Sequence, residues 1–247
     1  MGATGSSKSG SSNSIMSYQD GGTNVKFESP LVYSDKKQTL PDKSNTQIIS
    51  FENKHTGSKR EHSIFLMDDG SVVETNTGGR TSVSASLGAR QKADIMSHNH
   101  PNPVEGALGG TFSGADLNNF INFGQHMYRA SAKEGTYVIS MNTSDPSYTR
   151  TNALNLLNQY QSLEKQQNRQ YKKLQKQWMS ETSQEISNIY SNKKLSSAEK
   201  SKKINEANNK FMEKQRDLAN KNLIEAHNWL IQNANSHGFT YGLERRG

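Results

Sequence analysis

The feature that most restricts the fold is a polar segment, residues 147–236, whose apolar residues recur at helical spacing. Steps of three, four or their multiples place such residues on one side of a helix. A first row consists of Leu154, Leu157, Leu163, Tyr171, Leu174, Trp178, Ile186 and Ile189. A second row consists of Ile204, Ala207, Phe211, Leu218, Ile224, Leu230 and Ile231. Two helices of about 40 residues would each be about 60 Å long.

A polar break at residues 192–194 separates the two rows. After it, Leu195 precedes Ser196 and Glu199, which have the spacing of a capping box at a helix start. Gly238 is typical of a C-terminal helix stop. We therefore expect a long antiparallel helical hairpin with coiled-coil packing over residues 147–237.

The remainder of the chain has an α+β pattern. Short apolar runs predict strands at residues 47–51, 61–67, 71–74, 93–97 and 136–141. Ser113 and Asp116 have the spacing of an N-cap and the third position of a helix. The alternating tail, residues 238–244, predicts a last strand that returns to this region. The fold class is therefore α+β, a domain of strands and helices into which the hairpin is inserted.

Composition divides the chain into four parts. Residues 1–45 are rich in Ser, Gly and Asn and are expected to form a flexible lead. Residues 46–146 form the expected α+β domain, residues 147–237 the hairpin, and residues 238–247 a C-terminal strand and tail.

The chain contains no cysteine among its 247 residues. Disulfide scaffolds and thiolate metal sites are therefore excluded, and a metal would be held by His, Asp or Glu. No apolar run approaches the roughly 20 residues that cross a bilayer, so no membrane span is expected. The N-terminal residues lack the apolar core of a signal peptide, which leaves the cytoplasm or export by a dedicated secretion system.

The net charge of +7 is compatible with acidic partners. The Lys and Arg residues of the hairpin are mixed with Glu and Gln and are not interleaved with aromatic residues. Nucleic-acid binding is therefore not expected, and a solvated face or a partner-binding arm is the better interpretation of the hairpin.

The most informative motif is His98-Asn99-His100-Pro101. Two histidines at positions i and i+2 of a strand point to the same side, so both can reach one metal ion. Asp116, in the first turn of the following helix, could turn toward the same ion. Two neutral histidines and one aspartate leave Zn²⁺ with an open position for water, which is typical of a catalytic site. The alternative is a pair of surface histidines near a capped helix.

Water at such a site needs a base. Glu61 opens the strand expected beside the one that carries His98 and is the candidate general acid/base. Glu52 and Glu74 lie on neighbouring segments and remain alternatives. Ser113 is interpreted first as an N-cap, and second as a hydroxyl that stabilises an oxyanion. The other candidate histidines lack ligand spacing and are expected at the surface or its boundary: His62, His126, His227 and His237.

The motif His98-Asn99-His100-Pro101 with Ser113-Gly114-Ala115-Asp116 resembles the HxHP…SxxD signature of the JAB/MPN (JAMM) zinc metalloprotease superfamily. It is similar to the RadC-like branch and to JAB-like domains of bacterial polymorphic toxins and phage proteins. Residues 61–70 also resemble the acidic-residue strand that begins those domains. The resemblance covers about residues 46–141.

By this resemblance, zinc is bound by His98, His100 and Asp116, and Glu61 is the acid/base. The fold implied is mixed α/β, and the reaction is cleavage of peptide or isopeptide bonds. Two features depart from the family pattern. The gap between His100 and Ser113 holds twelve residues and is Gly-rich, which is longer than usual, and the helical hairpin is additional.

Two functions follow as expectations. The first is a zinc-dependent peptidase or isopeptidase acting as an effector or toxin domain on a protein or peptide substrate, with an immunity protein or helical partner. The second is a non-catalytic helical interaction or structural protein, for example in phage morphogenesis, that carries an MPN-like domain.

Overall fold

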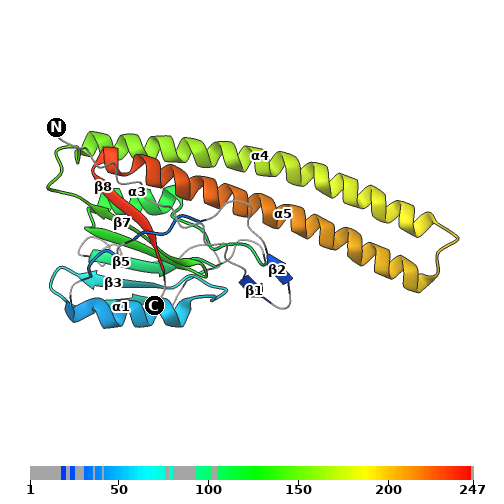
Figure 1. Cartoon of the computed structure of the whole chain (residues 1–247), viewed down its shortest axis with the longest axis horizontal. Coiled ribbons are helices and arrows are strands. Elements are labelled where there is room, and N and C mark those ends of the chain that lie inside the picture. Colours follow the sequence, from blue (N-terminus) through cyan, green and yellow to red (C-terminus); the bar gives the residue numbers. More distant parts are fainter. Residues whose placement is uncertain are drawn as a thin grey trace, which may run out of the picture.

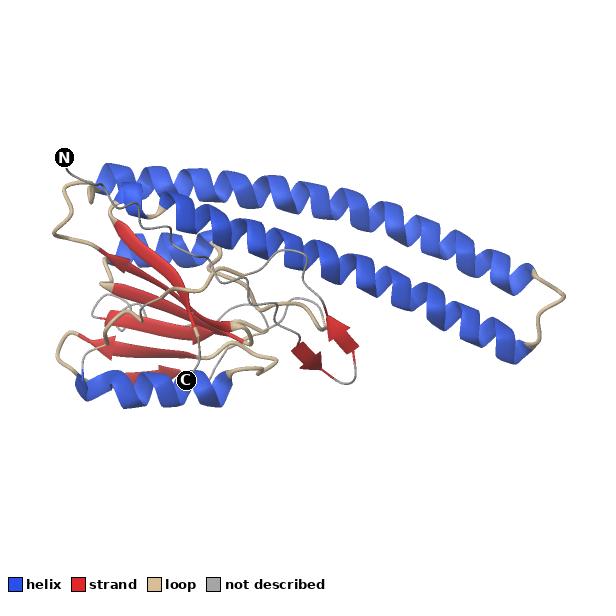
Figure 2. Ribbon diagram, in the orientation of Figure 1, coloured by secondary structure: helices blue, strands red, loops and turns tan. Residues whose placement is uncertain are grey.

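The computed structural model describes residues 18–20, 23–25, 31–35, 37–40, 42–75, 78–79, 93–101 and 105–245. A six-stranded mixed sheet with helices on both faces forms the body of the molecule, and two long helices project from it (Figures 1 and 2). The α+β class and the helical hairpin expected from the sequence are therefore confirmed. Within the expected lead, the described residues are a short antiparallel pair, β1 (Tyr18–Asp20) and β2 (Thr23–Val25), and residues 31–35, 37–40 and 42–45. Of these, the Ser34 N–H donates to the Leu243 carbonyl at 2.8 Å.

The main sheet has the strand order β4-β3-β5-β6-β7-β8. Its members are β4 (Val72–Thr75), β3 (Ser63–Met67), β5 (Ala93–Asn99), β6 (Met127–Ala132), β7 (Gly135–Met141) and β8 (Phe239–Glu244). β5 and β6 are parallel, whereas the other neighbouring pairs are antiparallel. The expected hairpin β3–β4 and the returning C-terminal strand β8 are both present, and β3 begins at Ser63, two residues after Glu61.

Residues 47–51, expected to be a strand, belong instead to helix α1 (Asp42–His55). The prediction was wrong because the run of apolar residues is short and its period is ambiguous. The buried positions of this segment are Ile48, Phe51, Glu52 and His55, whose spacing of three and four is helical. The polar members Glu52 and His55 complete the buried face of α1 and hide its amphipathic pattern.

Helix α1 covers one face of the sheet through β3 and β5. The opposite face carries helix α3 (Gly114–Phe123) and the two long helices, α4 (Arg150–Ser191) and α5 (Ser197–Asn233). The main hydrophobic core lies on this second face, and its largest fully buried members are Tyr128, Tyr137, Tyr160, Phe65, Phe112, Phe120 and Phe239. Among the described helices, none combines the length and apolar composition that a membrane span requires.

Helices α4 and α5 pack antiparallel, and their outer part extends away from the sheet. Ser196 and Glu199 form the expected capping box at the start of α5. Glu181 and Glu185 of α4 pair with Lys214 and Lys210 of α5 at 3.1 and 3.8 Å. These ion pairs join exposed side chains and lie on one side of the hairpin.

A buried arginine joins helix α1 to the last strand of the sheet. Arg129, on β6, donates to Glu52 of α1 at 2.7 Å and to Glu244 of β8 at 3.2 Å. Ser97 of β5 and Thr136 of β7 donate to the same Glu52 carboxylate at 2.8 and 3.2 Å. The charge of Arg129 is thus compensated in the interior, and the carboxylates raise its pKa although burial alone would lower it.

The histidine His227 of α5 is fully buried, so the expectation that it lies at the surface or its boundary was wrong. Its Nε2 bonds to the Val32 carbonyl, and its Nδ1 bonds to the Tyr241 hydroxyl, both at 2.8 Å. A carbonyl can only accept, so Nε2 carries the proton and Nδ1 accepts from Tyr241. Burial lowers the pKa of His227 to about 4.

Replacing Glu52 should destabilise the fold strongly. Glu52→Gln leaves the buried Arg129 with less compensation, and breaking a buried ion pair costs about 3–5 kcal/mol. Glu74→Gln, at a partly exposed carboxylate on β4, should cost no more than about 1 kcal/mol. The free energies of unfolding in urea measure both, and equal costs for the two variants would contradict the central role of Glu52.

The pH dependence of stability should report on His227. Its pKa is near 6.5 in the unfolded chain and about 4 in the folded protein, so the unfolded state takes up the proton first. Stability is therefore lost as the pH falls from 6.5 to about 4, by about 3 kcal/mol from this group. His227→Gln should flatten the slope over this range relative to wild type. His126→Gln, at an exposed histidine, is the control that should leave the slope unchanged.

Candidate metal centre

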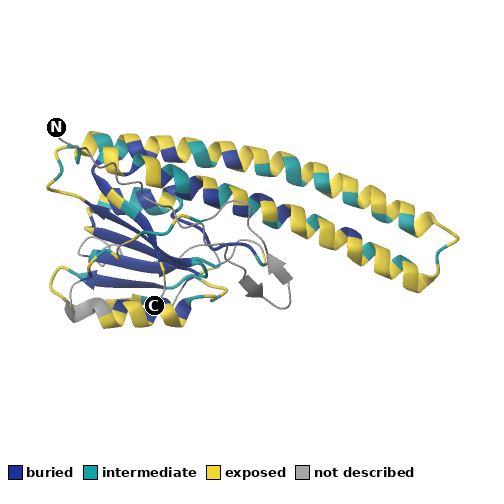
Figure 3. Ribbon diagram, viewed as in Figure 1, coloured by how far each residue is buried: buried dark blue, intermediate teal, exposed yellow. Residues whose placement is uncertain are grey.

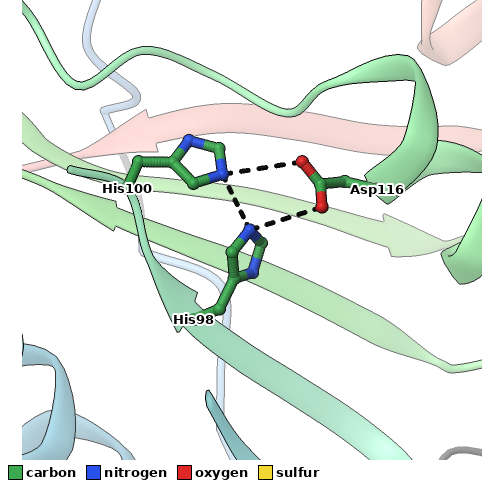
Figure 4. Close-up of side chains that lie close together, drawn as sticks. All are labelled: His98, His100 and Asp116. Carbon is green, nitrogen blue, oxygen red and sulfur yellow. Dashed lines mark hydrogen bonds and ion pairs between the residues drawn. The ribbon is translucent and has the colours of Figure 1, made fainter. Parts of the chain in front are cut away.

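Strand β5, an interior strand of the sheet, carries two histidines at its carboxyl end. His98 lies on the strand and His100 directly follows it, with their side chains turned to the same side (Figure 4). The two Nε2 atoms are 2.7 Å apart. The alternation of a strand places Ser97 on the opposite face, where it bonds to Glu52.

Asp116 completes the group from the first turn of α3. Its carboxylate oxygens lie 3.5 Å from the Nε2 atoms of His98 and His100. One ligand atom from each of these three residues lies within 4.8 Å of the others. His98 is buried, and the side chains of His100 and Asp116 are 11 % and 18 % exposed, so the group is nearly closed to solvent.

Ser113 fixes the aspartate. Its hydroxyl and backbone N–H both donate to Oδ2 of Asp116, at 2.7 and 2.8 Å, and its hydroxyl oxygen accepts from the Asp116 N–H. The N-cap expected at Ser113 is thus confirmed as a full capping box. The local sequence that begins the helix therefore also orients the third ligand.

The second ring nitrogen of His100 has a backbone partner. Nδ1 of His100 lies 3.0 Å from the carbonyl oxygen of Gly110, so Nδ1 carries the proton and Nε2 keeps its lone pair for a metal. Nδ1 of His98 is buried and has no hydrogen-bond partner within the described part of the chain.

The loop that presents Gly110 is held from several sides. The Glu134 carboxylate accepts from the N–H groups of Gly109 and Gly110, at 3.1 and 2.7 Å. Asn220 of α5 accepts from the Leu108 N–H at 2.9 Å. The described residues 105–112 of the Gly-rich gap between His100 and Ser113 are therefore held in place and support His100, and the base of the hairpin contributes to this support.

Two glycines in this loop meet specific demands. Gly110 has a φ of +89°, and a Cβ there would lie 2.3 Å from Cδ2 of Leu223 on α5. A Cβ on Gly109 would lie 2.6 Å from the Ala132 Cβ. Glycine is therefore required at both positions for the loop to lie this close to the sheet and the hairpin.

The surroundings of Asp116 favour the ionised form of its carboxyl group. Burial would raise the pKa of Asp116, but the neighbouring His98 and His100 outweigh it and hold the pKa well below the usual value. For His100, burial would lower the pKa, but Asp116 and the Gly110 carbonyl raise it overall. The site thus presents one carboxylate charge between two imidazoles.

The three glutamates considered for the base lie in different surroundings. Glu61 interacts electrostatically with His98, His100 and Asp116, and burial raises its pKa. Glu52 is bound by Arg129, and Glu74 is bound by Lys54 and His55 on α1. Glu61 is therefore the member of this trio that interacts electrostatically with the histidine–aspartate group, whereas Glu52 and Glu74 are bound by basic side chains elsewhere.

Sequence reasoning missed two acidic residues that support the site. Glu134 lies in the turn between β6 and β7, and no local pattern relates it to Gly109 and Gly110. Glu164 of α4 accepts from the Gly114 N–H at 2.9 Å and covers the start of α3. Its partial burial raises its pKa. Glu164 lies in a helix rich in Lys and Gln residues, and no sequence pattern distinguishes it as a residue that supports the site.

The His98, His100 and Asp116 group could hold a metal ion. It offers two imidazole nitrogens and one carboxylate from rigid elements, and the tautomer of His100 is set by a backbone carbonyl. Comparisons with protein-family models, with characterised proteins and with solved structures gave no match for this chain.

Displacing the Gly110 carbonyl tests whether its hydrogen bond to His100 supports metal binding. Gly110→Ala forces a side chain into left-handed backbone and against Leu223, which should displace the carbonyl and weaken the binding of a divalent metal ion about 10- to 100-fold, as for lost outer-sphere partners. Gly124→Ala is the matched control, because Gly124 also has a left-handed φ but open space around it. Its Zn²⁺ dissociation constant, measured by competition with a chromophoric chelator, should equal that of wild type.

Proposed function

We propose that this chain is a zinc-dependent hydrolase of peptide or isopeptide bonds, with zinc held by His98, His100 and Asp116. The observation that carries the proposal is the convergence of these three side chains, from β5 and α3, beside the carboxyl group of Glu61. The resemblance of the motif to the JAMM signature supports the same chemistry.

The donor set suits zinc. Two neutral imidazoles and one carboxylate leave the divalent ion with a net charge of +1, and three protein ligands are typical of catalytic zinc. When bound, the ion would polarise a carbonyl group and lower the pKa of a coordinated water. In the neutral ring, the hydrogen bond from His100 Nδ1 to the Gly110 carbonyl fixes the tautomer in which Nε2 is the ligating nitrogen.

Glu61 is proposed to move the proton. A carboxyl group of raised pKa is suited to accept a proton from water and return it to the leaving amine. Glu52 and Glu74 are less suited, since both are held by basic side chains.

Ser113 is proposed to act mainly by holding Asp116 in place. Its hydroxyl donates to Asp116 and its oxygen accepts from the helix backbone. Interaction with a developing oxyanion would require this hydroxyl to leave Asp116, so the positioning role is favoured.

The biological role proposed is that of an effector or toxin domain acting on a protein substrate, controlled by a partner such as an immunity protein. The long arm formed by α4 and α5 supports a second candidate, a non-catalytic interaction or structural protein. Its exposed Met179 and Tyr190 are 54 % and 63 % accessible, which favours contact with another protein.

Metal content and hydrolysis together test the proposal. Wild type and Glu61→Gln should each contain near-stoichiometric zinc by elemental analysis, whereas His98→Ala/His100→Ala should contain none. Glu61→Gln should cleave a library of linear and lysine-branched peptides about 10²- to 10⁴-fold more slowly, as expected for loss of a general base. New termini are detected by mass spectrometry.

Glu74→Gln is the matched control and should retain full activity. Wild type that stays free of zinc after refolding in zinc, or Glu61→Gln with undiminished cleavage, would contradict the proposal. Zinc binding without cleavage of any peptide would favour the non-catalytic candidate.

A further inference from the structure

The positive charge of the chain is concentrated on the helical hairpin. Residues 165–221 contain fourteen Lys and Arg against six Asp and Glu, a net charge of +8, whereas the whole chain carries +7. The rest of the molecule is thus nearly neutral. Most residues of this range are exposed (Figure 3), so their charge faces solvent and any partner that approaches.

The basic residues are densest on α4, between residues 165 and 180. Residues 165–180 contain five basic residues and no acidic one. All five are exposed, and none makes an ion pair within the described part of the chain. They are Lys165, Arg169, Lys172, Lys173 and Lys176. The ion pairs to Lys210 and Lys214 start beyond this stretch, at Glu181.

Helical spacing connects this basic surface to the site. Lys165, Lys172, Lys176 and Met179 follow Gln161 at steps of four, seven, four and three, and therefore share one face of α4. Gln161 itself lies against the start of α3, where a Cβ on Gly114 would be 2.9 Å from its Cγ. The face thus begins two residues from Asp116 and reaches Met179 after about 27 Å.

The same side of the arm also carries its exposed apolar residues. Tyr190 follows Met179 at eleven residues, three turns further along the same face. Met212 of α5 lies on the side opposite to Lys210 and Lys214, by the same helical spacing, and is 42 % exposed. The ion pairs with Glu181 and Glu185 occupy the other side. On one side of the arm, charges of α4 and α5 therefore neutralise each other in ion pairs. The other side carries basic residues of α4 that make no ion pair within the described ranges, together with the exposed apolar side chains.

We propose that Lys165, Lys172, Lys176 and Met179 form a docking face for an acidic segment of the protein on which the metal centre acts. The proposal rests on the proposed hydrolase function for the role of the bound protein. Charge complementarity selects an acidic partner, and Met179 supplies apolar contact that a protein segment can meet. A second copy of this chain is disfavoured because two arms of net charge +8 repel each other.

The position of the docking face beside the metal ligands would help to bring a bound substrate to the site. A substrate whose acidic segment lies along α4 would have its neighbouring residues beside Gln161 and the start of α3, next to Asp116. Binding energy from a remote segment would then increase the local concentration of the scissile bond at the site.

Binding of a labelled peptide tests the docking face without any need for catalysis. The probe is an 18-residue fluorescein-labelled helical peptide of Glu, Leu and Ala with Glu at steps of four and seven, and its Gln counterpart is the neutral control. Fluorescence anisotropy measures affinity for wild type, for Lys165→Glu/Lys172→Glu/Lys176→Glu, and for Lys193→Glu/Lys202→Glu/Lys203→Glu. The last variant changes three exposed lysines near the far end of the arm by the same total charge.

Wild type should bind the acidic peptide, and the Lys165/Lys172/Lys176 variant should bind it about 10-fold or more weakly. The variant near the far end should stay within about 2-fold of wild type at the same salt concentration. Met179→Gln should also weaken binding, but less. Circular dichroism should show unchanged helix content, because all of these positions are exposed.

Equal losses in the two triple variants, or no saturable binding by wild type, would overturn the proposal. So would tighter binding of an 18-base-pair DNA duplex with the same dependence on Lys165, Lys172 and Lys176, since the face would then serve nucleic acid. Failure of the hydrolase function is a separate outcome, because peptide binding requires neither zinc nor Glu61. For a peptide that the enzyme cleaves, an appended acidic segment should lower KM in wild type but not in the Lys165/Lys172/Lys176 variant.

Discussion

The buried contact between Arg129 and Glu52 is the interaction on which the rest of the domain depends. It joins α1 to the centre of the sheet, and the second carboxylate, Glu244, ties in the last strand. Ser97 of β5 shares the Glu52 carboxylate, so the strand that carries His98 is anchored on one face while its histidine points to the other. A buried charge requires this degree of compensation, and the requirement holds the strands around the metal centre in register.

A second set of contacts holds the loop before α3 against the base of the hairpin. Asn220 holds Leu108, Leu223 packs on Gly110, and Glu164 caps Gly114. Through Gly110 and Asp116 these contacts reach two of the three candidate ligands. The hairpin is therefore part of the support of the metal centre, and its outer length is free to serve a partner. This division explains why one pair of helices can be tightly packed at its base and exposed at its far end.

The chemistry and the charge distribution favour the same direction of approach for a protein substrate. The metal centre lies beside the start of α3, and the basic face of α4 begins at the same place. In the hydrolase that we propose, Glu61 would move the proton at the metal ligands and the arm would hold the remainder of the substrate. In a non-catalytic protein the arm would retain its binding role, and the buried histidines would serve as a structural metal site.

The sequence by itself determined the features that depend on local spacing. Repeated three- and four-residue steps gave the hairpin, His98 and His100 gave the paired ligands, and Ser113 with Asp116 gave the capping box, since each pattern acts over a few residues. Tertiary structure decided the rest. Residues 47–51 became helix because the buried face of α1 includes Glu52 and His55, and Arg129 could lie within a buried strand because carboxylates 77 and 115 residues away compensate it. The choice among Glu52, Glu61 and Glu74 likewise depended on which basic side chains the fold placed beside each, and no local pattern encodes contacts between segments so far apart in the chain.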